Sequence, residues 1–195
     1  MKISALPLVS YFYRQKIKEQ LMAKYIKPLS FIVLLATMFG CTTGKPNNIE
    51  AVTPFVLNKY LGTWHEIARM DHSFERDLDY VTATYSMNED GSVKVVNRGF
   101  NTQSKEWKEA IGKAKFVEND NVGYLKVSFF GPFYGSYIIF YLEPDYSTAL
   151  ISSYNYDYFW LLSRQKQISP KQLERYTHIA KEAGFDTDKL IYPKQ

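Results

Sequence analysis

Cysteine, histidine and long apolar runs are all scarce in this sequence of 195 residues. Its single cysteine, Cys41, excludes an internal disulfide bond and any zinc site built from cysteine ligands. The three histidines, His65, His72 and His178, lack the spacing of metal ligands, and His65-Glu66 is not followed by the second histidine of a metalloprotease motif. The sequence also contains neither a serine-nucleophile elbow nor a phosphate-binding glycine loop. We therefore expect no metal, no cofactor and no catalytic residue.

Positive charge is concentrated at the N-terminus. Lys and Arg number 24 and Asp and Glu number 20, but residues 1–40 hold six of the basic residues and one of the acidic residues. Residues 41–195 are therefore nearly neutral, with 18 basic and 19 acidic residues. Scattered lysines on a near-neutral domain do not form the basic surface that binds nucleic acid, so we expect no nucleic-acid partner.

Residues 24–41 have the organisation of a secretion signal. Two lysines precede an apolar run, Leu29–Phe39, and a small residue, Gly40, stands directly before Cys41. The run is shorter than the ~20 residues that a membrane-spanning helix needs. It also lacks the alternating polar residues of an amphipathic core helix. Met22 begins a compact form of the same signal and is an alternative start of the protein.

Cys41 stands where a bacterial lipoprotein signal places its lipidated cysteine, so we expect it to be acylated; a buried or free thiol is the alternative. Several acyl chains anchor a protein firmly, because each buried methylene contributes ~0.8 kcal/mol. Thr42 differs from the Asp that commonly retains such lipoproteins in the inner membrane. The resemblance implies a lipid-anchored protein of the outer membrane, on its periplasmic face. The expected organisation is a lipoprotein signal peptide (1–40), a lipidated tether (41–54) and one folded domain (55–195).

Short apolar or alternating segments, divided by turn residues, fill most of the folded domain. Aromatic residues make up 16% of the sequence, an enrichment that favours strands over helices. The predicted strands are Gly62–Met70, Tyr80–Met87, Ser92–Phe100, Lys105–Phe116, Gly123–Phe130, Tyr134–Leu142, Thr148–Tyr154 and Tyr158–Arg164. Eight sequential strands with short connections favour an antiparallel up-and-down barrel over a β-sandwich, which is the structural alternative.

A helix is predicted after the last strand. Ser169 can cap its N-terminus, Pro170 suits its first position, and Gly184 ends it. A short strand at Leu190–Tyr192 would then return to the sheet. The expected fold class is all-β, an eight-stranded barrel with one C-terminal α-helix packed outside.

Two motifs carry a family resemblance. The segment 58–68, which contains Gly62-Thr63-Trp64, resembles the first motif of the lipocalin family, and the segment 157–164 resembles the lipocalin strand that ends in Arg164. The stretch 127–135 is similar to bacterial outer-membrane lipocalins. The resemblance implies a cup closed at one end, where Arg164 stacks on Trp64 in a structural cation–π contact worth ~0.5–2 kcal/mol.

The alternation of residues along each strand assigns side chains to the two faces of the barrel. Trp64, Glu66, Ala68 and Met70 share a side of the first strand. In residues 134–142 the odd-numbered and the even-numbered positions are both apolar, so the sequence does not decide which set lines the cup. Ile139 belongs to one of the two sets. The residues expected to contact a lipid are Glu66, Ala83, Tyr85, Leu125, Val127, Phe129, Ile139 and Trp160. The alternative for each one is that it only fills the core.

Two surface segments have separate interpretations. The acidic residues Asp71, Glu75, Asp77 and Asp79 are expected to form a solvated loop between the first two strands. The aromatic stretch Phe129–Tyr134 is expected to contact the membrane, to form a homodimer face or to fold back into the core.

The resemblance implies a protein that binds fatty acids or lysophospholipids for lipid storage or transport in envelope maintenance. An apolar tube with a polar mouth suits such single-chain amphiphiles. Two alternatives remain: an enzyme that converts lipids inside the barrel, for which only Glu66 and the tyrosines offer acid–base groups, and a structural lipoprotein without a ligand.

Overall fold

The computed structural model describes residues 43–195. The chain divides into two compact units, residues 1–40 and residues 41–195, and the description below concerns the second. The predictions of the signal peptide, the start at Met22 and the acylation of Cys41 fall on residues outside the described range. Within that range, no helix is long and apolar enough to cross a membrane.

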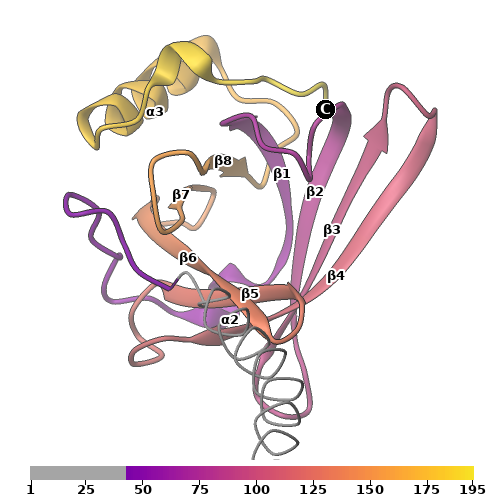
Figure 1. Cartoon of the computed structure of the whole chain (residues 1–195). Coiled ribbons are helices and arrows are strands. Elements are labelled where there is room, and N and C mark those ends of the chain that lie inside the picture. Colours follow the sequence, from indigo (N-terminus) through magenta and orange to yellow (C-terminus); the bar gives the residue numbers. More distant parts are fainter. Residues whose placement is uncertain (1–42) are drawn as a thin grey trace, which may run out of the picture. The chain divides into compact units, whose positions relative to one another are not determined.

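Eight antiparallel strands form a closed barrel in which each strand pairs with its sequence neighbours and β1 also pairs with β8 (Figure 1). The strands are β1 (Gly62–Arg69), β2 (Leu78–Met87), β3 (Val93–Asn101), β4 (Glu106–Phe116), β5 (Tyr124–Phe130), β6 (Phe133–Leu142), β7 (Thr148–Ser152) and β8 (Phe159–Ser163). All eight predicted strands are confirmed, and their ends agree within two residues. Closure leaves the barrel without an unpaired edge strand.

Two of the four register shifts in the barrel bear on the predicted faces of the strands. One lies between Glu66 and Ala68 in β1 and the other between Ile139 and Tyr141 in β6. A one-residue shift moves the following side chains to the opposite face. The prediction that Ala68 and Met70 share a side with Trp64 and Glu66 is therefore wrong, because both lie in the outer core.

The protein has two hydrophobic cores. The inner core fills part of the barrel and includes Trp64, Tyr85 and Ile151. The outer core lies between the barrel wall and the C-terminal helix α3 (Pro170–Glu182), whose Tyr176 and Ala180 are buried against it. Figure 1 shows this helix, in yellow, outside the strands.

Local hydrogen bonds define the N-terminus of α3. The Ser169 hydroxyl accepts a bond from the Gln172 backbone N–H, and the Gln172 side chain accepts one from the Ser169 backbone N–H. This reciprocal capping box satisfies N–H groups that the helix leaves unpaired.

After the 3-10 turn η1 (Thr187–Lys189), Ile191 forms a single bridge with Arg69, so the strand predicted at 190–192 is reduced to that bridge.

Candidate functional site

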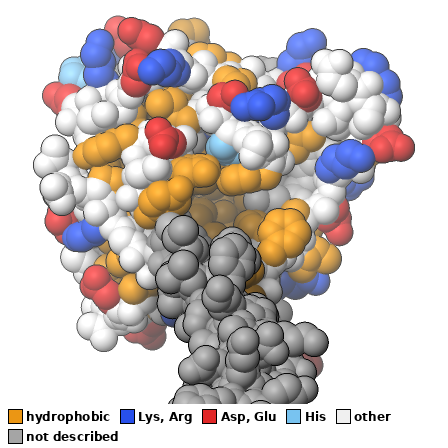
Figure 2. Space-filling view, in the orientation of Figure 1, with side chains coloured by type: hydrophobic (Ala, Val, Ile, Leu, Met, Phe, Trp, Pro, Cys, Tyr) orange, Lys and Arg blue, Asp and Glu red, His pale blue; other side chains and the backbone are white. Residues whose placement is uncertain are grey.

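A cavity of about 330 Å³ occupies the barrel. This volume lies at the lower end of the ~300–1,000 Å³ range of small-molecule sites, which favours one acyl chain over two. Hydrophobic side chains surround a hollow on the face shown in Figure 2. The lining combines apolar wall residues with a few polar groups: Phe55, Leu57, Tyr60, Glu66, Phe74, Glu75, Val81, Ala83, Tyr85, Val93, Val95, Asn97, Ala114, Leu125, Val127, Phe129, Gly135, Ser136, Tyr137, Ser153, Tyr154, Tyr158, Trp160 and Leu162.

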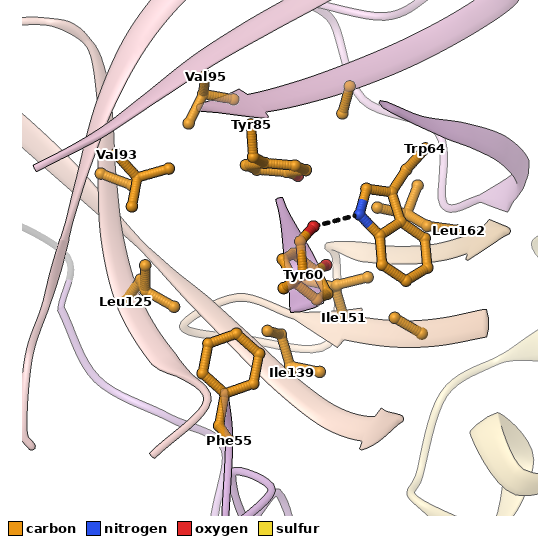
Figure 3. Packing of buried hydrophobic residues seen from close by; sticks show 13 residues of the cluster. Phe55, Tyr60, Trp64, Tyr85, Val93, Val95, Leu125, Ile139, Ile151 and Leu162 are labelled. Carbon is orange, nitrogen blue, oxygen red and sulfur yellow. Dashed lines mark hydrogen bonds between the residues drawn. The ribbon is translucent and has the colours of Figure 1, made fainter. Parts of the chain in front are cut away.

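The closed end of the barrel, the floor of the cavity, is formed around the short helix α2 (Leu57–Tyr60). The indole N–H of Trp64 donates to the Tyr60 carbonyl oxygen at 2.8 Å, and the two rings lie 4.7 Å apart (Figure 3). Tyr60 and Tyr85 also pack ring to ring at 5.4 Å. The helix is therefore held to the first strand by both ring packing and a hydrogen bond.

Arg164 seals the same end from outside. Its guanidinium carbon lies 3.9 Å from the centroid of the Trp64 ring, which confirms the stack predicted from the sequence. Its Nη1 donates to the Thr63 carbonyl, and its Nη2 lies within bonding distance of the carbonyls of Lys59, Tyr60 and Leu61. Gly62 stands beside it with φ +94°, and a Cβ on Gly62 would lie 3.4 Å from Nη1. The glycine of the first motif thus permits the left-handed backbone, and the distance to the arginine is an ordinary van der Waals contact.

Three tyrosine hydroxyls meet at the floor. The Tyr137 hydroxyl oxygen lies 2.7 Å from that of Tyr60 and 2.7 Å from that of Tyr85. Burial raises the pKa of all three hydroxyls above the ordinary value of 10. All three are therefore uncharged O–H groups at neutral pH.

The opposite end of the cavity, its mouth, is rimmed by aromatic side chains. Phe74 packs against His72 at 4.2 Å and lies nearly parallel to Tyr158 at 6.0 Å, and Tyr158 in turn stacks on Trp160 at 6.2 Å. Phe74 is 64% exposed. Arg164 follows Trp160 by four positions, just after the end of β8, so the aromatic rim and the sealed floor are roughly 13 Å apart along the chain.

A buried polar cluster lies beside the mouth. Arg69 Nη1 donates to Glu66 Oε1 at 2.6 Å, and Arg69 Nη2 donates to the Glu75 carbonyl oxygen at 2.7 Å. The Glu75 carboxylate accepts the Trp160 indole N–H at 2.9 Å, and His72 Nε2 lies 3.0 Å from the same oxygen. Glu66 and Glu75 both line the cavity, so this cluster places two carboxyl groups against any bound ligand.

The two carboxyl groups have opposite pKa shifts. Burial, together with the neighbouring Glu75 charge, raises the pKa of Glu66 well above its ordinary value. Burial would raise the pKa of Glu75 as well, but His72, the Trp160 N–H and Arg69 outweigh it and hold that pKa below its ordinary value. The cluster therefore stabilises the charged form of Glu75, whereas burial disfavours the charged form of Glu66.

The burial of Glu75 corrects a prediction. The sequence predicted a solvated acidic loop from residues 71 to 79, but Glu75 is only 7% exposed and turns into the barrel. Its partners Arg69, His72 and Trp160 come from β1, the loop and β8, so no local pattern marked it.

Seven of the eight residues expected on the cup interior line the cavity: Glu66, Ala83, Tyr85, Leu125, Val127, Phe129 and Trp160. Ile139 is the exception. It is fully buried in the inner core and is not among the residues that line the cavity, so its position does not support the predicted contact with a ligand. Before the register shift in β6, Tyr137 faces the cavity; after it, Leu142 packs against the inner core and Tyr141 against the outer one, so neither parity that the sequence left open lines the cup throughout. Sequence reasoning missed Tyr60, which precedes the first strand.

The β5–β6 turn carries the aromatic stretch noted in the sequence. Phe129 lines the cavity, whereas Phe130 is 81% exposed.

No group of three or more His, Cys, Asp or Glu side chains within residues 43–195 is arranged to hold a metal ion.

Comparison with known proteins places this geometry in a family. A family model described as a lipocalin-like domain matches residues 55–195. The chain belongs to the lipocalin family. This lipocalin is 49% identical over 166 residues to the outer membrane lipoprotein Blc of Vibrio cholerae, a match that covers 85% of this chain and 97% of the relative. It is 44% identical over 150 residues to the outer membrane lipoprotein Blc of Escherichia coli K12, covering 77% and 85%.

A solved structure agrees on the fold of this lipocalin. Insecticyanin from the tobacco hornworm Manduca sexta matches with a TM-score of 0.60 at 16% identity, covering 78% of this chain and 87% of that one. At that level of identity the match shows the barrel and not its ligand.

Proposed function

We propose that this lipocalin binds a single-chain lipid, a fatty acid or lysophospholipid, in its barrel and stores or carries it for maintenance of the cell envelope. The observation that carries the proposal is the cavity itself, an apolar tube sealed at the Trp64–Arg164 end and bordered by polar groups at the other. Each buried methylene contributes ~0.8 kcal/mol, so one acyl chain supplies enough free energy for binding. The head group remains at the polar mouth.

The proposed location is the outer membrane, with the protein held on the periplasmic face by acyl chains on Cys41. The curated relatives named as outer membrane lipoproteins support this location. The basic and apolar segment before Cys41 supports it independently. The acylated cysteine would keep the barrel at the membrane surface, where single-chain lipids occur.

Lipid binding is tested by titrating the purified protein with lysophosphatidylcholine and with palmitate while Trp fluorescence is recorded. A saturable change is expected, because Trp160 lines the cavity. Native mass spectrometry of the same preparation reports co-purified lipid, its stoichiometry and the oligomeric state of the protein together. Absence of a saturable response to every single-chain lipid would reject the proposal and would favour a structural lipoprotein without a ligand.

A matched pair of variants separates cavity binding from adsorption to the surface. Val95 lines the cavity, and its neighbour Val96 points to the outer face, where it pairs with the exposed Ile111. Val95→Phe should fill part of the tube and weaken binding at least about tenfold, a difference of ~1.4 kcal/mol. Val96→Phe should leave the affinity within about twofold. Equal effects of the two variants would place the lipid outside the barrel.

Conversion of the bound lipid is the second candidate. It is favoured by the opposite pKa shifts of Glu66 and Glu75, because such pairs serve as acid and base in enzymes. Their bonds to Arg69 and Trp160 give the same residues a structural explanation. Product analysis after incubation with lysophospholipid decides: unchanged lipid supports a carrier, and a released fatty acid supports an enzyme.

A further inference from the structure

The cluster of tyrosine hydroxyls at the floor has more hydrogen-bond donors than bonds. Tyr60, Tyr85 and Tyr137 each carry one hydroxyl proton, and the three groups form two hydrogen bonds among themselves. Tyr137 is the shared partner in both. Whichever way these bonds are directed, one hydroxyl proton has no acceptor among residues 43–195. The oxygen atoms also retain acceptor sites, because each hydroxyl can accept two bonds.

The spare donor is within reach of a group bound in the cavity. All three tyrosines line the cavity, and Tyr60 and Tyr85 are 2% and 7% exposed. A buried donor left without an acceptor destabilises the complex. A plain hydrocarbon tail pushed to the floor would impose that cost, whereas a chain with an oxygen atom at its inner end would remove it.

The floor is suited to an uncharged group. The hydroxyls remain protonated, and the nearest cation, Arg164, lies behind the Trp64 ring with its Nη1 and Nη2 donating to backbone carbonyls. A carboxylate at the floor would therefore lose its hydration without gaining an ion pair, which is costly. A hydroxyl or carbonyl group can accept the spare proton at a much smaller desolvation cost.

We propose that the tyrosine cluster at the floor is a binding site for an uncharged oxygen group, a hydroxyl or a carbonyl, at the inner end of a single-chain lipid. The preferred ligand then carries oxygen at both ends, a charged head at the mouth and a neutral group at the floor. This inference rests on the proposed function, since it assumes that the cavity holds a single acyl chain.

The test compares fatty acids with their ω-hydroxy counterparts at 12, 14 and 16 carbons, so that one length matches the depth of the cavity. Affinities are measured by calorimetry at pH 7.5 for the wild-type protein and for the triple variant Tyr60→Phe, Tyr85→Phe and Tyr137→Phe. Single variants are unsuitable because any two remaining tyrosines still leave a spare donor. At the best chain length, the preference for the ω-hydroxy acid should fall at least about tenfold in the triple variant.

Tyr124→Phe is the control, because Tyr124 is buried in the outer core and does not line the cavity. It should keep the wild-type preference. If wild type and triple variant bind both ligand series with the same ratio, the inference is overturned while the proposed function stands. If no ligand binds the wild type, the proposed function fails with it.

If the triple variant does not fold, a second measurement on the wild-type protein tests the inference. In a crystal structure of the wild-type protein with the best ω-hydroxy acid, the ligand hydroxyl should lie within hydrogen-bond distance of a tyrosine hydroxyl at the floor. A ligand hydroxyl at the mouth or in solvent would overturn the inference.

Discussion

The guanidinium of Arg164 lies flat over the indole of Trp64, at 3.9 Å from the ring centroid. The two residues are joined twice more through the backbone of the α2–β1 segment: the indole N–H bonds to the Tyr60 carbonyl, and the guanidinium bonds to the same carbonyl and to Leu61. Two residues that are 100 positions apart in the sequence thereby close one end of the barrel.

Arg164→Lys should lower the free energy of unfolding by about 2–4 kcal/mol. Lysine keeps the charge but loses the planar stack and the fork of N–H donors that reaches several carbonyls at once. Chemical denaturation in urea measures the change. Arg175→Lys is the control, because the side chain of that arginine is half exposed and lysine keeps the charge that pairs with Glu143; it should change stability much less. An unchanged midpoint for Arg164→Lys would refute a structural role for the stack.

Replacing the two buried carboxyl groups should have unequal effects at pH 7. Glu66→Gln removes a charge that burial disfavours and keeps an oxygen that can accept from Arg69, so stability should stay within about 1 kcal/mol. Glu75→Gln removes the charge that Trp160 and His72 contact and should cost about 2 kcal/mol. Denaturation of both variants provides the comparison. A larger loss for Glu66→Gln than for Glu75→Gln would contradict the opposite directions of the two pKa shifts.

The same pair predicts opposite pH dependences. The folded pKa of Glu75 lies below its ordinary value of 4.5, so its contribution is complete above that pH and is lost as the pH falls through the folded pKa. The folded pKa of Glu66 lies above 4.5, so its contribution is complete below that pH and is lost as the pH rises through the folded pKa. The free energy of unfolding is measured from pH 3 to 8. In Glu75→Gln it should fall less at acid pH than in the wild type, and in Glu66→Gln it should depend less on pH above 4.5. Curves parallel to wild type in both variants would count against these assignments.

Cys41→Ser should release the protein from the membrane fraction and remove the acyl mass from the mature chain, because only a thiol accepts the lipid. Fractionation and intact-mass measurement test this. Thr42→Asp is the companion variant: it should keep the acyl mass and shift the protein toward the inner membrane. A wild-type protein without added mass would reject acylation.

Sequence reasoning succeeded where a regular pattern extends along one strand. The alternation of apolar residues located all eight strands, and the Trp64 and Arg164 motifs located the sealed end. It failed at Ala68 and Met70, because a register shift after Glu66 reverses the faces of β1 and leaves no mark in composition. The register shift after Ile139 likewise leaves no mark in the composition of the strand.

The polar parts of the cavity were the hardest to predict. Glu75 is buried because Arg69, His72 and Trp160 surround it, and these partners lie on separate elements. The tyrosine cluster combines Tyr60, Tyr85 and Tyr137 from α2, β2 and β6. Such clusters depend on three-dimensional assembly, so a single sequence without its fold does not reveal them.

Pairing of β1 with β8 also constrains how the chain folds. His65 meets Ser163, and Glu66 meets Leu162, so the first strand acquires its second neighbour only after the last strand has been synthesised. Contacts between residues so distant in the sequence slow folding, because the loss of loop entropy precedes the gain of the contact. Until that step the first and last strands are unpaired edges that can join another chain. The kinetic risk of aggregation is therefore greatest before closure and ends when Arg164 reaches the carbonyl of Thr63.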